Sequence, residues 1–145
     1  MAFNVFLDTN IIVDLLDPLR PFHYESTLLF NLLDQGNFKG YYSESVVTTT
    51  AYVIRKDYPK NKICEIVDSL NKKIILLPCI ARNVNDVTGK NPPDFEDGLL
   101  YEIALHHQLD YFITSNTRDF KRIQNTLLPV INAKAFNKIL GVDLN

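Results

Sequence analysis

Short apolar runs alternate with longer amphipathic stretches along the whole chain. Five of these runs contain β-branched or aromatic residues and are too short for helices, so we expect them to form buried strands. The five runs are Phe3–Leu7, Gly40–Ser43, Ile74–Leu77, Tyr111–Ile113 and Pro129–Ile131.

Helical periodicity fills the segments between these runs. In residues 23–33 four leucines fall on one stripe, and the pair Gly36-Asn37 ends the pattern. In the pair Tyr58-Pro59 the proline is expected to end one helix and to allow the next to start. One helix is expected directly after Asp8, and the others are expected at His23–Leu33, Val46–Lys56, Lys60–Leu70, Ile80–Val87, Phe95–Gln108 and Ala133–Ile139.

The alternation of strands with single or paired helices predicts parallel crossover connections. We therefore expect an α/β fold, a three-layer α/β/α sandwich with a central parallel sheet. In such folds the functional crevice lies at the carboxyl ends of the strands. Asp8 directly follows the first predicted strand, so it is placed at that crevice.

Size, composition and charge narrow the class of protein. With 145 residues, we expect one domain over residues 1–145. No segment approaches the roughly 20 apolar residues of a membrane span. The N-terminus also lacks the basic region of a signal peptide, so we expect a cytoplasmic protein without a membrane partner. The net charge of −2 argues against a broad electrostatic nucleic-acid binder, but a nuclease stays open because clustered carboxylates lower the net charge.

The two cysteines, Cys64 and Cys79, lie in apolar surroundings and lack the spacing of a metal site. A cytosolic protein keeps such thiols reduced. We expect both to be buried free thiols without a role in chemistry.

Acidic and polar residues follow strand ends or open helices in three stretches, residues 7–10, 93–97 and 113–120. If the strands are neighbours in the sheet, Asp8, Asp97 and Asp119 converge on one small volume. Carboxylates so close repel one another unless a cation lies between them. Oxygen-only ligands suit Mg²⁺ or Mn²⁺, and the lack of a His or Cys cluster argues against zinc.

Each of these acids also has a purely structural interpretation. Asp8 is suited to cap the helix that follows it. Asp94 is well placed as an N-cap after two prolines, with Asp97 reaching back as in a capping box. Asp119 is suited to an ordinary turn. Three such caps gathered at one end of the sheet are less expected than a shared site, although capping stays the leading role for Asp94.

Taken in order, these stretches resemble a known family. Residues 6–16, Phe-Leu-Asp-Thr-Asn-Ile-Ile-Val-Asp-Leu-Leu, look like the opening of a PIN domain, and residues 94–99 and 113–120 look like its third and fourth motifs. The resemblance covers essentially the whole chain. It implies a parallel sheet flanked by helices and Mg²⁺- or Mn²⁺-dependent cleavage of single-stranded RNA. Many bacterial members of this length are toxins of toxin–antitoxin pairs (the VapC type), which implies an antitoxin partner and a homodimer.

The resemblance also assigns roles to individual residues. It implies that Asp8, Asp97 and Asp119 are the catalytic and metal-binding acids. It further implies that the supporting polar side chains are Asn10, Thr114 and Asn116. Beside Asp119, three basic residues are suited either to steering an RNA backbone or to forming a solvated turn, namely Arg118, Lys121 and Arg122.

One family motif is altered in this chain. The family usually carries a second acid, a Glu in the helix after the second strand, and by spacing that position is Thr49. A Thr hydroxyl can hydrogen-bond a metal-bound water but brings no negative charge. Glu44 lies at the preceding strand end and would have to reach the site by another route. A subset of bacterial PIN proteins with a similar layout also lacks this Glu, and we expect weaker metal binding and activity.

Two other functions stay open at this stage. The first is a PIN-fold protein with a degenerate site that acts as an RNA- or protein-binding module, and Thr49 is its motivation. The second is a phosphatase-like hydrolase on another doubly wound sheet. That hydrolase would need a second Asp two residues after Asp8, and Asn10 occupies this position.

Overall fold

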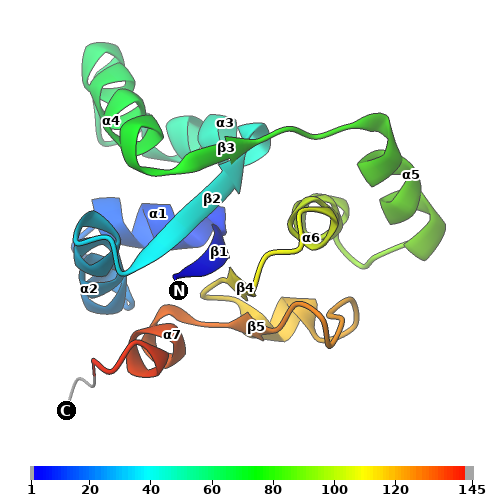
Figure 1. Cartoon of the computed structure of the whole chain (residues 1–145). Helices are drawn as coiled ribbons and strands as arrows, with labels where there is room; N and C mark the ends of the chain where they lie inside the picture. Colours follow the sequence, from blue (N-terminus) through cyan, green and yellow to red (C-terminus); the bar gives the residue numbers. More distant parts are fainter. Residues whose placement is uncertain (1, 143–145) are drawn as a thin grey trace.

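A five-stranded parallel sheet organises the chain, of which the computed structural model describes residues 2–142 (Figure 1). The strands are β1 (Phe3–Leu7), β2 (Phe38–Ser43), β3 (Ile75–Leu77), β4 (Tyr111–Ile113) and β5 (Val130–Ile131). Their order is β3-β2-β1-β4-β5, and every neighbouring pair is parallel. This pairing confirms the predicted parallel sheet. Each strand also falls on one of the predicted apolar runs.

Helices cover both faces of this sheet. They are α1 (Thr9–Leu16), α2 (His23–Asp34), α3 (Glu44–Ile54), α4 (Lys60–Lys73), α5 (Ala81–Lys90), α6 (Phe95–His106) and α7 (Ala133–Ile139), with a short 3₁₀ helix η1 (Thr117–Phe120). In Figure 1, α2 and α7 lie to the left of the sheet and α6 lies to the right. This arrangement is the expected three-layer α/β/α sandwich.

Aromatic side chains fill the core on both faces of the sheet. On one face, Phe6 of β1 stacks on Phe112 of β4 with ring centroids 5.1 Å apart, and Tyr101 of α6 packs against Phe112. On the other face, Phe136 of α7 meets Phe3 of β1. Successive residues of a strand point to opposite faces, so β1 contributes to both halves of the core. A parallel sheet covered on both faces in this way leaves its strand ends as the place for a site.

The structure moves some helix boundaries. Helix α3 begins at Glu44, two residues before the expected start, because the chain enters the helix directly from the strand end at Ser43. Helix α6 ends at His106 rather than at Gln108, because Gln108 adopts a left-handed backbone conformation with φ 56°. Pro59 precedes α4 as its N-cap residue, as expected.

The expectation of buried cysteines is wrong. Cys64 and Cys79 are both exposed free thiols. Cys64 lies on α4 and Cys79 follows β3, and β3 is an end strand of the sheet. Apolar side chains of β3 are incompletely covered there as well, since Ile75 is 45% exposed and Leu76 is 49% exposed.

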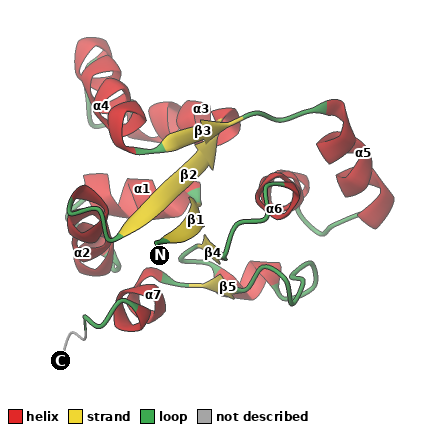
Figure 2. Ribbon diagram, viewed as in Figure 1, coloured by secondary structure: helices red, strands yellow, loops and turns green. Residues whose placement is uncertain are grey.

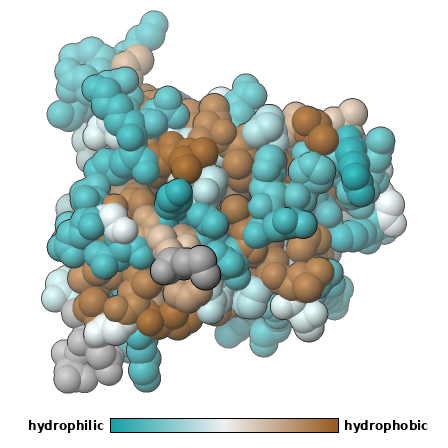
Figure 3. All heavy atoms as spheres, viewed as in Figure 1, coloured by the Kyte–Doolittle hydropathy of each residue, from teal (hydrophilic) through white to brown (hydrophobic). Residues whose placement is uncertain are grey.

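Helix α5 packs against α6 and lies apart from the sheet (Figure 2). A salt bridge joins Lys90 at the end of α5 to the buried Glu102 of α6. Gly98 allows α6 to approach α5 and the loop that joins them, because a Cβ there would lie 3.3 Å from Val87 Cγ1 of α5 and 2.5 Å from Pro92 Cγ of the loop. Figure 3 shows mostly hydrophilic atoms over α4 and α5 on this face. Within residues 2–142 no helix is both long and apolar enough to cross a membrane.

Candidate active site

Asp8 lies at the carboxyl end of the two central strands. It directly follows β1, and its backbone N–H donates to the Ile113 carbonyl of β4 at 3.0 Å. Its Oδ1 accepts a hydrogen bond from the Thr9 backbone N–H at 2.7 Å and thereby caps α1. The capping interpretation is therefore confirmed, and it leaves the second carboxylate oxygen for other partners.

Polar side chains fix this second oxygen. Asp8 Oδ2 accepts from Thr114 Oγ1 at 2.8 Å and from Asn10 Nδ2 at 3.3 Å. Asn10 Oδ1 in turn accepts from the Ser115 backbone N–H at 2.9 Å, so residues after β4 hold residues after β1. Asp8 is 5% exposed, and burial raises the pKa of its carboxyl while the hydrogen bonds partly oppose that rise.

Asp97 approaches the same volume from α6. Asp94 caps this helix, since its Oδ1 accepts from the Asp97 backbone N–H at 2.9 Å. The reciprocal bond of a capping box is not among the hydrogen bonds of the described chain, so only half of that expectation holds. Burial is the largest cause of a rise in the Asp97 pKa to about 7, followed by the charges of Asp94, Asp8, Asp119 and Glu96. These charges show that the acids lie close enough to repel one another.

The acids line two adjoining hollows on the surface. One, of about 250 Å³, contains Asp8 and Asn10 together with Arg20, and the other, of about 500 Å³, contains Asp119. Asp94 and Asp97 line both hollows and therefore mark where they meet. The second hollow is also lined by three basic side chains, those of Arg118, Lys121 and Arg122.

Asp119 and its neighbours lie on the short helix η1. Phe120 is 1% exposed and packs on Phe112, which anchors this segment to the sheet. Asp119 is exposed at the hollow. Asn116 contributes its backbone N–H, which donates to Thr114 Oγ1 at 3.1 Å. Its exposed side chain has no hydrogen bond to an acid among residues 2–142.

Helix α3 lines the hollow beside Asp8 with an apolar side chain, and Thr49 is not among the lining residues. Val53 lines the hollow beside Asp8. Thr49 lies one turn before Val53, on the same face of the helix, and is partly buried. Glu44 lines a different groove, between α3 and α4, so it does not replace the missing carboxylate.

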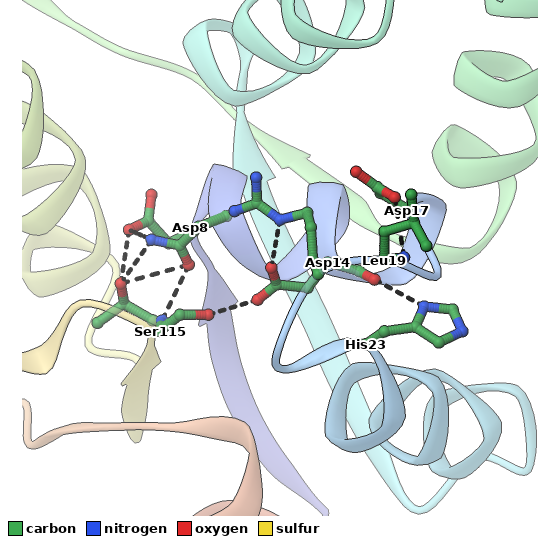
Figure 4. Close-up of polar contacts among 9 residues, drawn as sticks. Asp8, Asp14, Asp17, Leu19, His23 and Ser115 are labelled. Carbon is green, nitrogen blue, oxygen red and sulfur yellow. Dashed lines mark hydrogen bonds and ion pairs between the residues drawn. The ribbon is translucent and has the colours of Figure 1, made fainter. Parts of the chain in front are cut away.

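Four residues at or beside the site were not predicted from the sequence, namely Asp14, Arg20, Glu96 and Ser115. Arg20 and Glu96 line the hollow with Asp8, and Asp14 and Ser115 lie just behind it, joined to Arg20 and Asn10 by hydrogen bonds (Figure 4). Asp14 carries the one available sequence feature, an acid inside the apolar pattern of the first helix. Nothing in the order of residues links it to Ser115, because the two lie 101 positions apart.

The chemistry of the site suits a hard divalent cation. The side chains that could hold such an ion are carboxylates, and the mutual repulsion at Asp97 would be relieved by positive charge. Thr9 lines the Asp8 hollow, and its buried Oγ1 has no hydrogen-bond partner within residues 2–142. Among the described side chains no three of the His, Cys, Asp and Glu residues lie close enough to hold one ion together. An ion would therefore take part of its ligands from water, as Mg²⁺ commonly does.

Comparisons with known proteins agree with this architecture. A family model described as PIN domain matches residues 4–118. Ribonuclease VapC1 of Aquifex aeolicus is 30% identical over 122 residues, which cover 81% of this chain and 83% of that protein.

Solved structures share the fold at lower sequence identity. VapBC2 from Rickettsia felis, crystallised with a DNA fragment from its promoter, gives a TM-score of 0.67 at 20% identity, covering 89% of this chain and 98% of that one. VapBC-1 from nontypeable Haemophilus influenzae gives 0.65 at 19% identity, with 90% and 98% covered. VapC20 of Mycobacterium tuberculosis, described as a sarcin-ricin loop cleaving toxin, gives 0.61 at 11% identity, with 74% and 86% covered.

Proposed function

Because this chain belongs to the PIN domain family, we propose that it is a metal-dependent endoribonuclease that cleaves single-stranded RNA. One observation carries the proposal: carboxylates from three separate segments meet at the carboxyl end of the sheet, where Asp8 and Asp119 help to raise the pKa of Asp97. Such a cluster costs stability, and structural capping alone does not require it. A cation-dependent reaction gives the cluster a use.

Asp8, Asp97 and Asp119 are the proposed catalytic residues and ligands for Mg²⁺ or Mn²⁺. Thr114 donates its hydroxyl proton to Asp8 and so favours the ionised carboxylate. Asn10 holds both Asp8 and the segment after β4. When bound, the cation stabilises negative charge on phosphate oxygens and lowers the pKa of a coordinated water.

Basic residues beside the acids would hold the substrate. Arg118, Lys121 and Arg122 line the hollow that Asp119 shares with Asp97. Their positive charges offset the repulsion between the acidic cluster and a polyanion. Contacts of this kind position the RNA backbone without reading its sequence.

We further propose that the protein is a cytoplasmic toxin with an antitoxin partner, and that it forms a homodimer. The support is the likeness to Ribonuclease VapC1 and to structures of VapBC pairs. Expression of such a toxin alone is expected to arrest growth, and co-expression of the partner is expected to relieve the arrest.

The test of the nuclease uses Asp8→Asn in the full chain. Asn keeps a side-chain oxygen for the cap at α1, so the variant is expected to fold. Cleavage of a labelled single-stranded RNA with Mn²⁺ should fall by at least about 100-fold. The site would lose a main proposed ligand of the cation that stabilises charge on the reacting phosphate. The matched control is Asp68→Asn on α4, where the carboxylate is exposed and pairs with Lys72 at 3.0 Å. Cleavage by Asp8→Asn at the wild-type rate would refute the proposal.

A second function is supported by Thr49 and by the absence of a trio of acids close enough to share an ion within residues 2–142. Under this alternative the protein is an RNA- or protein-binding module with a degenerate site. It predicts no saturable Mn²⁺ binding and no cleavage, while RNA or protein binding is retained. Calorimetric titration of the wild-type protein with Mn²⁺ separates the two functions.

A further inference from the structure

Arg20 occupies the turn between α1 and α2 and is held by a buried acid. Its Nε lies 2.6 Å from Asp14 Oδ1. The Asp14 side chain is 1% exposed, whereas that of Arg20 is 38% exposed. The turn itself is fixed by the Arg20 backbone N–H, which donates to the Asp17 carbonyl at 3.1 Å. The guanidinium therefore has one anchored edge and one side open to solvent.

Asp14, which holds Arg20, is connected to the hydrogen bonds around Asp8. Ser115 Oγ donates to the second oxygen of Asp14 at 2.6 Å, and the Ser115 backbone N–H donates to Asn10. Figure 4 shows Ser115 between the Asp8 group and Asp14, with hydrogen bonds on both sides. The position of the guanidinium is thus tied to the position of the proposed metal-binding carboxylate.

The open side of Arg20 faces the proposed active site. Arg20 is the one basic residue in the described lining of the hollow that contains Asp8 and Asp97. In the hydrogen bonds of residues 2–142 its Nε donates, and Nη1 and Nη2 have no acceptor. An arginine offers five N–H donors in a planar fork that matches phosphate oxygens, so most of its donors stay available to a ligand.

The two hollows together suggest the path of a substrate. The basic residues at 118, 121 and 122 line one hollow, Arg20 lines the other, and the acids Asp94 and Asp97 separate them. A nucleic-acid strand that passes over these acids can place phosphates against positive charge on both sides. If Arg20 only neutralised Asp14, it would not need to line the hollow or to keep its other N–H donors free.

We propose that Arg20 binds a phosphate of the RNA strand beside the acidic cluster, and that Asp14 and Ser115 position its guanidinium. This inference rests on the proposed nuclease function. It adds a phosphate contact on the α1 side of the site to the contacts expected from the basic residues after β4. Asp14 and Ser115 act through Arg20 and are positioning residues.

The test measures RNA binding separately from cleavage. A fluorescein-labelled single-stranded oligoribonucleotide is titrated with wild-type protein and with Arg20→Gln in EDTA, over a series of salt concentrations. The dissociation constant of Arg20→Gln should rise roughly tenfold, as for a lost charge-assisted hydrogen bond. The slope of log affinity against log salt should shrink by about 0.7, the value for one phosphate contact to a single strand. Arg82→Gln on α5 is the control, because it also removes one arginine paired with an aspartate but lies outside both hollows, and it should leave both values unchanged.

Two further variants separate phosphate binding from a structural role. The double variant Asp14→Asn/Arg20→Gln removes the buried charge together with its partner, so it is expected to fold even if Arg20→Gln does not. If Arg20 only neutralises Asp14, the double variant regains wild-type RNA affinity, and this result overturns the inference. Arg20→Lys should keep the salt slope and lose part of the affinity, because lysine keeps the charge without the fork.

Failure of this inference is distinguishable from failure of the proposed function. A wild-type protein that cleaves RNA, with Arg20→Gln unchanged in affinity and salt slope, overturns the role of Arg20 alone. A wild-type protein that neither binds nor cleaves single-stranded RNA overturns both.

Discussion

Removing the charge of Asp97 should make the protein more stable while it removes activity. The pKa of this carboxyl rises from 3.8 to about 7 in the folded chain, first through burial and then through neighbouring carboxylates. At 1.36 kcal/mol per pKa unit, the full rise corresponds to roughly 4 kcal/mol. Asp97 is only half-buried, so solvent screening reduces the expected cost of its charge to about 1–2 kcal/mol.

An opposing contribution lowers the expected gain. Asp97 lies in the first turn of α6, where a negative charge interacts favourably with the helix dipole by about 0.3–1 kcal/mol. We therefore expect Asp97→Asn to stabilise the protein by about 1 kcal/mol at pH 8. For a chain of this length that corresponds to a rise in melting temperature of roughly 2–4 °C.

The gain should depend on pH in a defined direction. Below about pH 4 the carboxyl of Asp97 is protonated in both folded and unfolded chains, so its charge has no effect. Between pH 4 and pH 7 the unfolded chain releases this proton while the folded chain retains it, and the wild type loses stability relative to Asp97→Asn. Above pH 7 both states are ionised and the difference stays constant.

The assay is thermal unfolding in EDTA at pH 4 and pH 8. Asp86→Asn on α5 is the control, because Asp86 is 43% exposed and pairs with Arg82 at 3.8 Å. It should change stability by less than about 0.5 kcal/mol at either pH. The reasoning is refuted if Asp97→Asn melts at or below the wild-type temperature at pH 8, or if its gain is equal at both pH values.

Two further predictions concern the missing acid and the contact between α5 and α6. Thr49→Glu should tighten Mn²⁺ binding about tenfold, roughly 1.4 kcal/mol, in a calorimetric titration. Thr48 lines the groove between α3 and α4, so Thr48→Glu should leave Mn²⁺ binding unchanged. Equal effects of the two variants would contradict the assignment of Thr49 as the position of the missing acid. Gly98→Ala should destabilise the protein by about 1–3 kcal/mol in chemical denaturation, because the new Cβ meets Pro92 Cγ at 2.5 Å. Gly89→Ala, whose Cβ enters open space in α5, should instead stabilise by up to about 1 kcal/mol, and a matching loss in both variants would count against the packing explanation.

Much of the fold was predictable because local pattern and chain chemistry determine it. The apolar runs predicted all five strands, and the proline at residue 59 predicted the break between α3 and α4. Asp8 was predictable both as a cap and as a candidate site residue, since each role depends on its place directly after β1. The placement of Asp119 near Asp8 followed from the rule that parallel strands bring their carboxyl ends together, because Asp119 lies in the segment after β4; Asp97 reaches the same place from the first turn of α6.

The sequence by itself therefore determined the layers of the fold, the end of the sheet that carries the site, and the acids that gather there. Only the tertiary structure decided which side chains complete that site. Ser115 meets Asp14 across 101 residues, and Arg20 reaches the hollow through a turn that has no periodic pattern. The exposure of Cys64 likewise depends on its position near the end strand β3, which the local apolar pattern does not reveal. The periodicity of apolar residues indicates which face of a helix or strand a residue occupies. Packing between distant segments decides which residues lie opposite that face.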